Sequence, residues 1–400
     1  MNDRRPGHAG TRYAFLAFFV AFFLLFTPFE QQSGGVNSMV PKYLVAGASI
    51  MLVAPLLFIR RVKFRTSSVL ALVALCTIVF HSMVMRPVPG QFIFLISAHI
   101  CLAVLLHEAS FAWKRQFESA VSMVLIVHAF FIILQASLFY VAGFGIYDFH
   151  RAIFGSHSRF AEDFLNIARF SGLMIEPGTY ANYIACLVAI LMVSADFSKR
   201  VMWTAFFSVV SIFLTNSGSS VYFVPVLIAL LAFLWRQRIR PSHVIILAGS
   251  IALYLFFSGF VAHLESRFLE REDGSLSHRM EGVAAYMATT LEEKFIGVGF
   301  GQDPCVRCYY QDIGVAFNLV TRGGIVVTSA LALMAFRSLS MNGLVLSVLL
   351  FLIPLNEKIF FYEAPIWVFM LFAATGIKNA KALQTVRRDS GQLKFAGLTR

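Results

Sequence analysis

The chain has 400 residues and a formal net charge of +12; 58% of its residues are hydrophobic and only 14% are charged. Soluble domains carry about a quarter charged residues, so this composition excludes an ordinary soluble protein. The apolar residues also come in blocks of about 17 to 24, which is the length that crosses a bilayer. We therefore expect a polytopic membrane protein, whose positive charge marks one side of the membrane and not a nucleic-acid site.

The apolar blocks predict an all-α bundle of about twelve transmembrane helices, built as one integral membrane domain over 1–400. The span 201–215 is short, so a tilted or re-entrant pair of helices is an alternative there. No small-residue cleavage site follows the basic start of the chain, and we interpret the first block as an uncleaved anchor. The expected spans are 13–29, 42–59, 67–85, 91–107, 119–142, 179–195, 201–215, 221–235, 243–262, 313–336, 341–355 and 361–376.

Lysine and arginine counts predict the orientation of these spans. With the N-terminus inside, the cytoplasmic segments hold 21 of these residues and the four short external loops hold three, at Lys42, Arg86 and Lys358. Both termini are therefore expected in the cytoplasm. The basic tail 377–400 is expected to lie against the anionic inner leaflet.

Two of the predicted external segments are long, namely 143–178 and 263–312. They hold eight lysines and arginines together with most of the carboxylates of the chain. Polar chemistry is therefore expected on the external face of the membrane.

The first external loop ends in RFSGLMIEPGTYANY, which begins at Arg169. Pro177 fits the first turn of a helix, and a carboxylate at Glu176 suits the positive end of the helix dipole. Arg169, with Arg159 before it, makes the loop cationic, and arginine can bind phosphate through two parallel hydrogen bonds. The loop thus predicts an anion-binding helix mouth in which Glu176 can act as a base. A turn and helix start without any function is the alternative.

The second external loop contains SLSHRMEGVAAYMATTLEEKF, in which apolar residues recur at helical spacing. This pattern predicts an amphipathic helix on the outer membrane surface. Ser277 is its expected N-cap, which places His278 and Arg279 in the first turn. A cation there opposes the helix dipole and so favours a binding role for Arg279. A simple ion pair with Glu272 or Glu281 is the alternative.

Beyond this helix, GVGFG (297–301) is interpreted as a tight turn, because no strand precedes it as in a dinucleotide-binding loop. Cys305 and Cys308 could form a small disulfide if this face is oxidising. Two cysteines alone make a poor zinc site, so no metal is expected. In the turn TNSGSS, Ser219 or Ser220 is the expected cap of the helix that follows.

Toward the middle of the predicted spans the one charged candidate is Arg322, in TRGGIVV. A charge at the bilayer centre costs roughly 2.5–3.5 kcal/mol on insertion scales, so Arg322 should face a partner or a wet cavity. It could reach toward the external loops or form a structural salt bridge. The other polar residues, His99, His128 and Gln135, are expected to form hydrogen bonds between helices and not a transport path.

Taken together, these motifs resemble the O-antigen polymerase and O-antigen ligase superfamily of bacterial surface-polysaccharide enzymes. RFSGLMIEPGTYANY resembles the arginine–glycine–proline segment that enters a helix in that family. TNSGSS falls where the family has a serine-rich turn, often with an arginine that is absent here. SHRMEG, GVGFG and DIGVAFNLVTRGGIVV resemble its second loop and the helix after it. The resemblance covers about residues 140–336.

The resemblance implies a metal-independent, inverting glycosyltransferase that needs no cofactor. It would use undecaprenyl-diphosphate-linked oligosaccharides at the periplasmic face of the bacterial inner membrane. Membrane lipid and chain-length regulator and flippase proteins are the further expected partners, and nucleic acid is not. Fixed arginines suit such a reaction, because they stabilise the charge that develops on a diphosphate leaving group.

Carried onto this sequence, the family pattern makes Arg159 or Arg169, together with Arg279, the diphosphate clamp. Arg322 is a weaker fourth candidate, Glu176 is the expected base, and His278 is the second choice for that role.

The chain departs from the ligases, which tend to carry a histidine-led motif before the helix matching 313–336. Here Tyr310, Gln311 and Asp312 stand at that place. We therefore expect a polysaccharide polymerase. A ligase that transfers polymer to an acceptor, and a non-enzymatic flippase or transporter of lipid-linked glycans, are the alternatives.

Overall fold

A computed structural model of the chain is all-helical, and its described part contains no strand, which confirms the expected α class. Arg159, the segment 301–312 with Cys305 and Cys308, and the tail 377–400 lie outside the described residues. The described residues are 8–27, 40–60, 62, 64–158, 168–195, 198–235, 249, 274–300, 313–336, 341–356 and 363–375.

Within the described residues, six helices are long and apolar enough to cross a membrane, and they overlap the first six expected spans. The chain is therefore a membrane protein by the length and composition of its helices. These helices are α1 (His8–Leu25), α2 (Val40–Arg60), α3 (Thr66–Phe80) with its π-helical continuation η1 (His81–Met85), α4 (Gly90–Ala112), α5 (Lys114–Tyr140) and α7 (Pro177–Ser194).

The described residues form further helices beyond these six. Of the expected span 243–262, only Gly249 belongs to the described residues. The further helices are α6 (Phe149–Phe154), α8 (Lys199–Leu214), α9 (Gly218–Trp235), α12 (Gly274–Met287), α13 (Leu291–Ile296), α15 (Val315–Phe336), α16 (Met341–Asn356) and the last helix of the described part, Ala364–Thr375.

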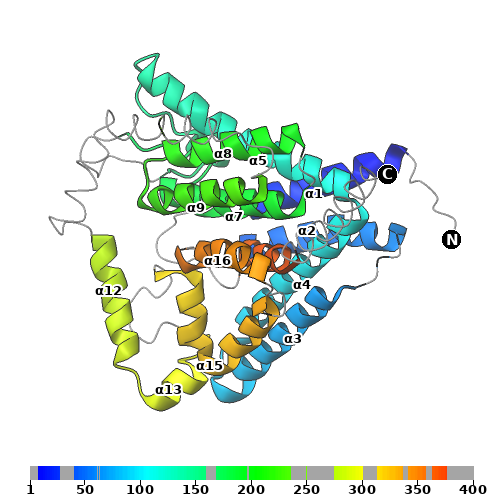
Figure 1. The fold of residues 1–400 in the computed structure, drawn as a ribbon, viewed down its shortest axis with the longest axis vertical. Coiled ribbons are helices and arrows are strands. Elements are labelled where there is room, and N and C mark those ends of the chain that lie inside the picture. Colours follow the sequence, from blue (N-terminus) through cyan, green and yellow to red (C-terminus); the bar gives the residue numbers. More distant parts are fainter. Residues whose placement is uncertain are drawn as a thin grey trace, which may run out of the picture.

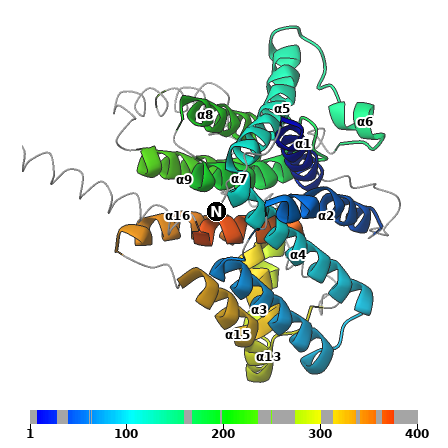
Figure 2. The same ribbon diagram turned by 90° about the vertical axis from the view of Figure 1, so that its right-hand side faces the viewer.

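The helix α7 forms the centre of the bundle. In its most apolar stretch 78% of the residues are buried, against 22% in α2. A helix that is apolar on every side is one that protein surrounds, whereas the exposed side chains of α2, such as Met51 and Phe58, suit contact with lipid. Both views show α7 and α9 between α5 on one side and α16 on the other (Figures 1 and 2).

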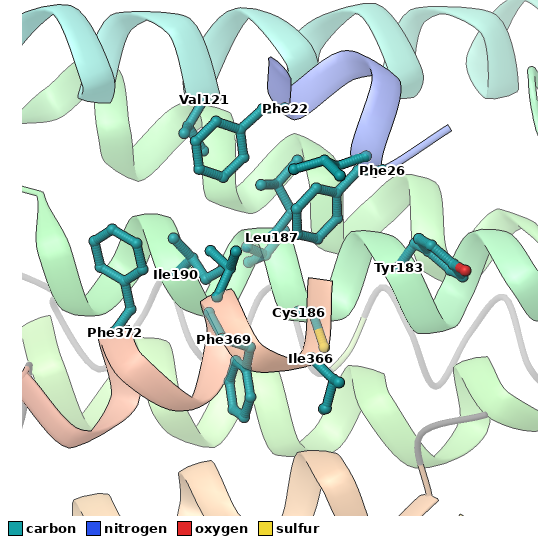
Figure 3. Close-up of a cluster of buried hydrophobic side chains, with 14 of the residues drawn as sticks. Phe22, Phe26, Val121, Tyr183, Cys186, Leu187, Ile190, Ile366, Phe369 and Phe372 are labelled. Atoms are coloured by element: carbon teal, nitrogen blue, oxygen red, sulfur yellow. The ribbon is translucent and has the colours of Figure 1, made fainter. Parts of the chain in front are cut away.

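The core around α7 combines side chains from both ends of the sequence. Aromatic rings of α1 meet apolar residues of α7 and of the last helix (Figure 3). The labelled members of this cluster are Phe22, Phe26, Val121, Tyr183, Cys186, Leu187, Ile190, Ile366, Phe369 and Phe372. The N-terminal and C-terminal helices are thus held together through α7.

Two expectations about the second long loop are wrong. The helix α12 begins at Gly274, so Ser277 lies inside it, and His278 and Arg279 follow the first turn. The helix also ends before Leu291, which belongs to α13. The division has a local cause: Thr290 accepts a hydrogen bond from the Glu293 N–H, and the Glu293 carboxylate accepts one from the Thr290 N–H. This reciprocal cap starts a new helix and lowers the pKa of Glu293.

The span expected at 313–336 is not one continuous helix. Gly324 interrupts α15 with φ 59° and ψ −161°. A Cβ at Gly324 would lie 2.3 Å from the carbonyl oxygen of Phe295, so only glycine fits both this backbone conformation and this contact. The break therefore arises from the approach of the segment that follows α13.

Candidate functional site

The residues ahead of α7 form a buried loop. From Ala168 to Glu176, the side chains are buried except for Arg169 and Glu176, which are both partly exposed. These are the two residues of the loop that the sequence selected as functional. The loop thus presents one cationic and one acidic residue on an otherwise enclosed backbone.

A glutamine of α5 anchors the centre of this loop. The Oε1 of Gln135 accepts hydrogen bonds from the backbone N–H groups of Ser171 at 3.0 Å and Gly172 at 2.9 Å. Its Nε2 donates to the carbonyl of Tyr147 at 2.6 Å. Gly172 has φ 57°, and a Cβ there would lie 3.1 Å from the Ile132 side chain. Gln135 is therefore a structural hydrogen-bonding residue, but its partners lie in two loops and not on another helix as predicted.

Two further side chains fix the ends of the loop. The Nδ1 of His150, on α6, lies 2.7 Å from the carbonyl oxygen of Leu173. The Nδ2 of Asn216 donates to the carbonyl of Ala168 at 2.8 Å. Since Asn216 belongs to the turn TNSGSS, that turn supports the residue next to Arg169. The motifs TNSGSS and RFSGLMIEPGTYANY, which are separate in the sequence, are therefore in direct contact.

The turn TNSGSS itself is capped differently from the prediction. The Ser220 N–H donates to the Oγ of Ser217 at 3.1 Å, and α9 begins at Gly218. Ser217 is therefore the cap, and Ser219 and Ser220 lie in the first turn. The cap therefore lies two or three residues earlier than expected, directly after Asn216, which adopts a positive φ of 49°.

Glu176 and Pro177 lie where the sequence places them. Pro177 is the first residue of α7, and Glu176 is the flanking residue with φ −149° and ψ 154°. The Glu176 carboxylate does not cap the helix, and its Oε1 accepts a hydrogen bond from the Thr179 hydroxyl at 3.1 Å. The carboxylate thus lies beside the positive end of the helix dipole and accepts no capping hydrogen bond from the helix backbone.

A second polar cluster, which the sequence did not reveal, lies further along α7. The Nζ of Lys42 is 2.7 Å from Oε1 of Glu363, and the hydroxyl of Tyr183 donates to Oε2 of the same carboxylate. Tyr183 follows Glu176 by seven residues, which is two turns on the same helix face and about 10 Å along the axis. We name Lys42, Tyr183 and Glu363 the triad.

The triad lines a small cavity of about 60 Å³, together with His99 and apolar side chains of α1 and α2. The sequence contains one indication of the triad, because Tyr183 is the last residue of the motif RFSGLMIEPGTYANY. The pairing itself was not visible, because Lys42 and Glu363 are 321 residues apart in the chain.

Arg322 lies at the break in α15, where the glycine turn 297–301 reaches the helix. The N–H groups of Val298 and Gly299 donate to the carbonyls of Thr321 and Arg322, both at 2.9 Å. The Arg322 side chain is 6% exposed, and its Nε donates to Oδ1 of Asn318 at 2.5 Å. The prediction that the Arg322 guanidinium has a polar partner is confirmed, and the side-chain amide of Asn318 is one such partner.

The same turn also contacts the end of α3. The Nε2 of His81 lies 2.5 Å from the carbonyl oxygen of Ile296, and a Cβ at Gly299 would lie 2.8 Å from the Cβ of Arg86. The guanidinium of Arg86 is 3.8 Å from the carboxylate of Glu292 on α13. The turn therefore joins α13, α3 and α15 next to a buried arginine.

The structure describes the side chains of three of the predicted site residues. Arg169 and Glu176 share the loop before α7, and Arg322 lies where the glycine turn contacts α15. His278 and Arg279 belong to α12, but their side chains, like the whole of Arg159, are outside the described residues. The clamp formed by Arg169 and Arg279 therefore stays a prediction.

Comparison of the sequence with protein-family models and with curated proteins gives no match.

Proposed function

We propose that this protein is a polysaccharide polymerase of the O-antigen polymerase and ligase type. It joins undecaprenyl-diphosphate-linked repeat units at the periplasmic face of the inner membrane as an inverting, metal-independent glycosyltransferase with a GT-C-like architecture. The observation that carries the proposal is the loop 168–176. Three side chains from other elements hold its backbone, and its two partly exposed residues are Arg169 and Glu176.

The chemistry of the transfer matches this pair of groups. The acceptor hydroxyl of one repeat unit attacks the anomeric carbon of the donor glycan as the bond to the diphosphate breaks. Glu176 takes the hydroxyl proton, and Arg169 stabilises the negative charge that develops on the leaving diphosphate. Arg279 joins Arg169 in the clamp, with Arg159 and Arg322 as further diphosphate ligands and His278 as the second candidate base.

A rigid loop favours this reaction, because catalytic groups that are already positioned need no reorganisation during the transfer. The hydrogen bonds of Gln135, His150 and Asn216 to the loop backbone supply that rigidity. The proposal includes about twelve spans, both termini in the cytoplasm, and periplasmic positions for 143–178 and 263–312. On this topology the loop before α7 opens to the periplasm.

The decisive experiment is turnover by the purified protein of defined repeat units linked to undecaprenyl diphosphate, with the products read by mass. We expect Arg169→Ala to abolish long products and Arg169→Lys to be impaired, because a point charge cannot replace the planar fork of arginine. Arg115→Ala, at an exposed arginine in the first turn of α5, is the matched control and should elongate normally. Normal product length from well-folded Arg169→Ala protein would remove Arg169 from the clamp.

Deletion of the gene separates the polymerase from its alternatives. Loss of a polymerase leaves single repeats on the final acceptor, whereas loss of a ligase leaves a bare acceptor and polymer on the carrier. Movement of lipid-linked glycan across vesicles of the pure protein, without elongation, would replace the proposal with a flippase.

A further inference from the structure

A cavity of about 380 Å³ lies between α2, α4 and the start of α3, at the end of the bundle away from the triad. It is far larger than the space of about 10–15 Å³ that a single water needs. Phe58 and Phe64, at 82% and 59% exposure, lie on its rim, so it opens among side chains that suit contact with lipid. Its lining consists of Ala54, Leu57, Phe58, Val62, Phe64, Leu105 and Glu108.

Glu108 is the one charged residue among these lining residues, and its side chain is 1% exposed. Its Oε1 accepts hydrogen bonds from the Arg65 N–H at 2.9 Å and from the Ser68 hydroxyl. Its Oε2 has no hydrogen-bond partner, and the Nε of Arg65 is 3.9 Å away from it. A buried carboxylate oxygen without a donor is costly, so a ligand that supplies one would bind here with a gain.

The neighbours of Glu108 are already committed to other contacts. The guanidinium of Arg65 lies 3.5 Å over the ring of Phe111. The Nδ1 of His107 is 3.2 Å from the Ser68 hydroxyl, and its Nε2 is 2.8 Å from the Thr375 hydroxyl. Because Glu108 lines the cavity, a ligand held there is a source of the donor that Oε2 lacks.

We propose that this cavity binds the headgroup of a phospholipid that carries a primary ammonium, a phosphoethanolamine. The ammonium donates to Oε2 of Glu108, and a charge-assisted hydrogen bond of this kind is stronger than a neutral one. A quaternary ammonium has no N–H and cannot make it. Arg60, whose Nη1 donates to the Ala112 carbonyl, and Arg65, whose guanidinium lies over Phe111, follow the lining residues Phe58 and Phe64 in the chain, and their positive charge suits a lipid phosphate near the opening. The inference is independent of the proposed polymerase activity.

The test is native mass spectrometry of the purified full-length protein, titrated with phosphatidylethanolamine, phosphatidylcholine or phosphatidylglycerol of identical acyl chains. We expect the first lipid to bind about tenfold more tightly than the other two, as a hydrogen bond to a charged group predicts. Glu108→Gln should remove this preference. Glu118→Gln, at a carboxylate on α5 that is 3.8 Å from Lys114 and does not line the cavity, should keep it.

A second variant guards against a folding defect at Glu108. Ala54→Phe fills the cavity and leaves the carboxylate in place, so it should lower the affinity for phosphatidylethanolamine about tenfold as well. Free ethanolamine serves as a competitor: displacement of the lipid by millimolar ethanolamine would show that the headgroup alone supplies the recognition. Equal binding of the three lipids by the native protein, or an unchanged preference in Glu108→Gln or Ala54→Phe, would overturn the proposal.

Discussion

The last helix, Ala364–Thr375, has a polar cluster at each end, and the two clusters differ in how their carboxylates are satisfied. At its start, both oxygens of Glu363 have partners, in Lys42 and Tyr183. At its end, Thr375 contacts His107, whose neighbour in the chain is Glu108. One carboxylate oxygen of Glu108, Oε2, accepts no hydrogen bond. The adjoining cavities differ in the same sense, at about 60 and 380 Å³. Complete pairing indicates a joint between helices, and incomplete pairing beside open space indicates a binding site.

The largest effect should come from breaking the triad. Lys42→Met leaves the Glu363 carboxylate, which is only 9% exposed, without its cationic partner. Removal of one member of a buried pair is costly, and we expect a loss of about 3 kcal/mol in the free energy of unfolding. Thermal unfolding of the purified protein in detergent measures this. Lys114→Met, which breaks the more exposed Lys114–Glu118 pair, should cost less than about 1 kcal/mol. Equal losses in the two variants would show that the triad is not a structural joint.

A smaller loss is expected from Tyr183→Phe. This change removes one hydrogen bond to a charged group and keeps the ring in the core, so the cost should be about 1.5–2 kcal/mol. The double variant with Lys42→Met should lose less than the sum of the two single changes, because both act on Glu363. Strict additivity would mean that the two contacts are independent.

At the other end, Glu108→Gln should cost only about 1 kcal/mol in lipid-free detergent. The neutral amide still accepts from Ser68 and needs no counter-charge, so removal of the charge partly offsets the lost contacts. The difference from native protein should grow when phosphatidylethanolamine is added, because only the native carboxylate gains from the ammonium. A constant difference with and without this lipid argues against a role for Glu108 in binding.

The smallest effect is expected from Thr375→Val. The change removes the hydroxyl that His107 contacts at 2.8 Å and nearly preserves the side-chain volume. A loss of about 1 kcal/mol or less is expected in the same unfolding assay. Lipid preference should be unchanged, since Thr375 does not line the cavity. A change in preference would extend the site to the last helix.

The sequence predicts those features of the fold that depend on composition and local chemistry. Long apolar blocks identify the first six spans, and Pro177 marks the start of α7. Arg169 and Glu176 stand out because they are charged residues in an apolar stretch, and these two are the partly exposed residues of their loop. Each of these features is set by neighbours in the chain.

Features that depend on distant contacts are the ones the sequence does not predict. The break at Gly324 lies where Phe295 approaches α15, and the turn TNSGSS supports the loop before α7 through the hydrogen bond from Asn216 to Ala168. The triad joins residues from both ends of the chain. Local propensity carries no information on such pairings, because each residue would also be ordinary at a helix end.

The contact between the glycine turn and α15 also determines how movement passes between α13 and α15. Two N–H groups of the turn bind two carbonyls of α15, and a Cβ at Gly297 would lie 2.2 Å from the carbonyl oxygen of Arg322. No side chain separates the two backbones, so no rotamer change can absorb a displacement of one against the other. A shift of α13 should therefore move the peptide of Arg322 with it.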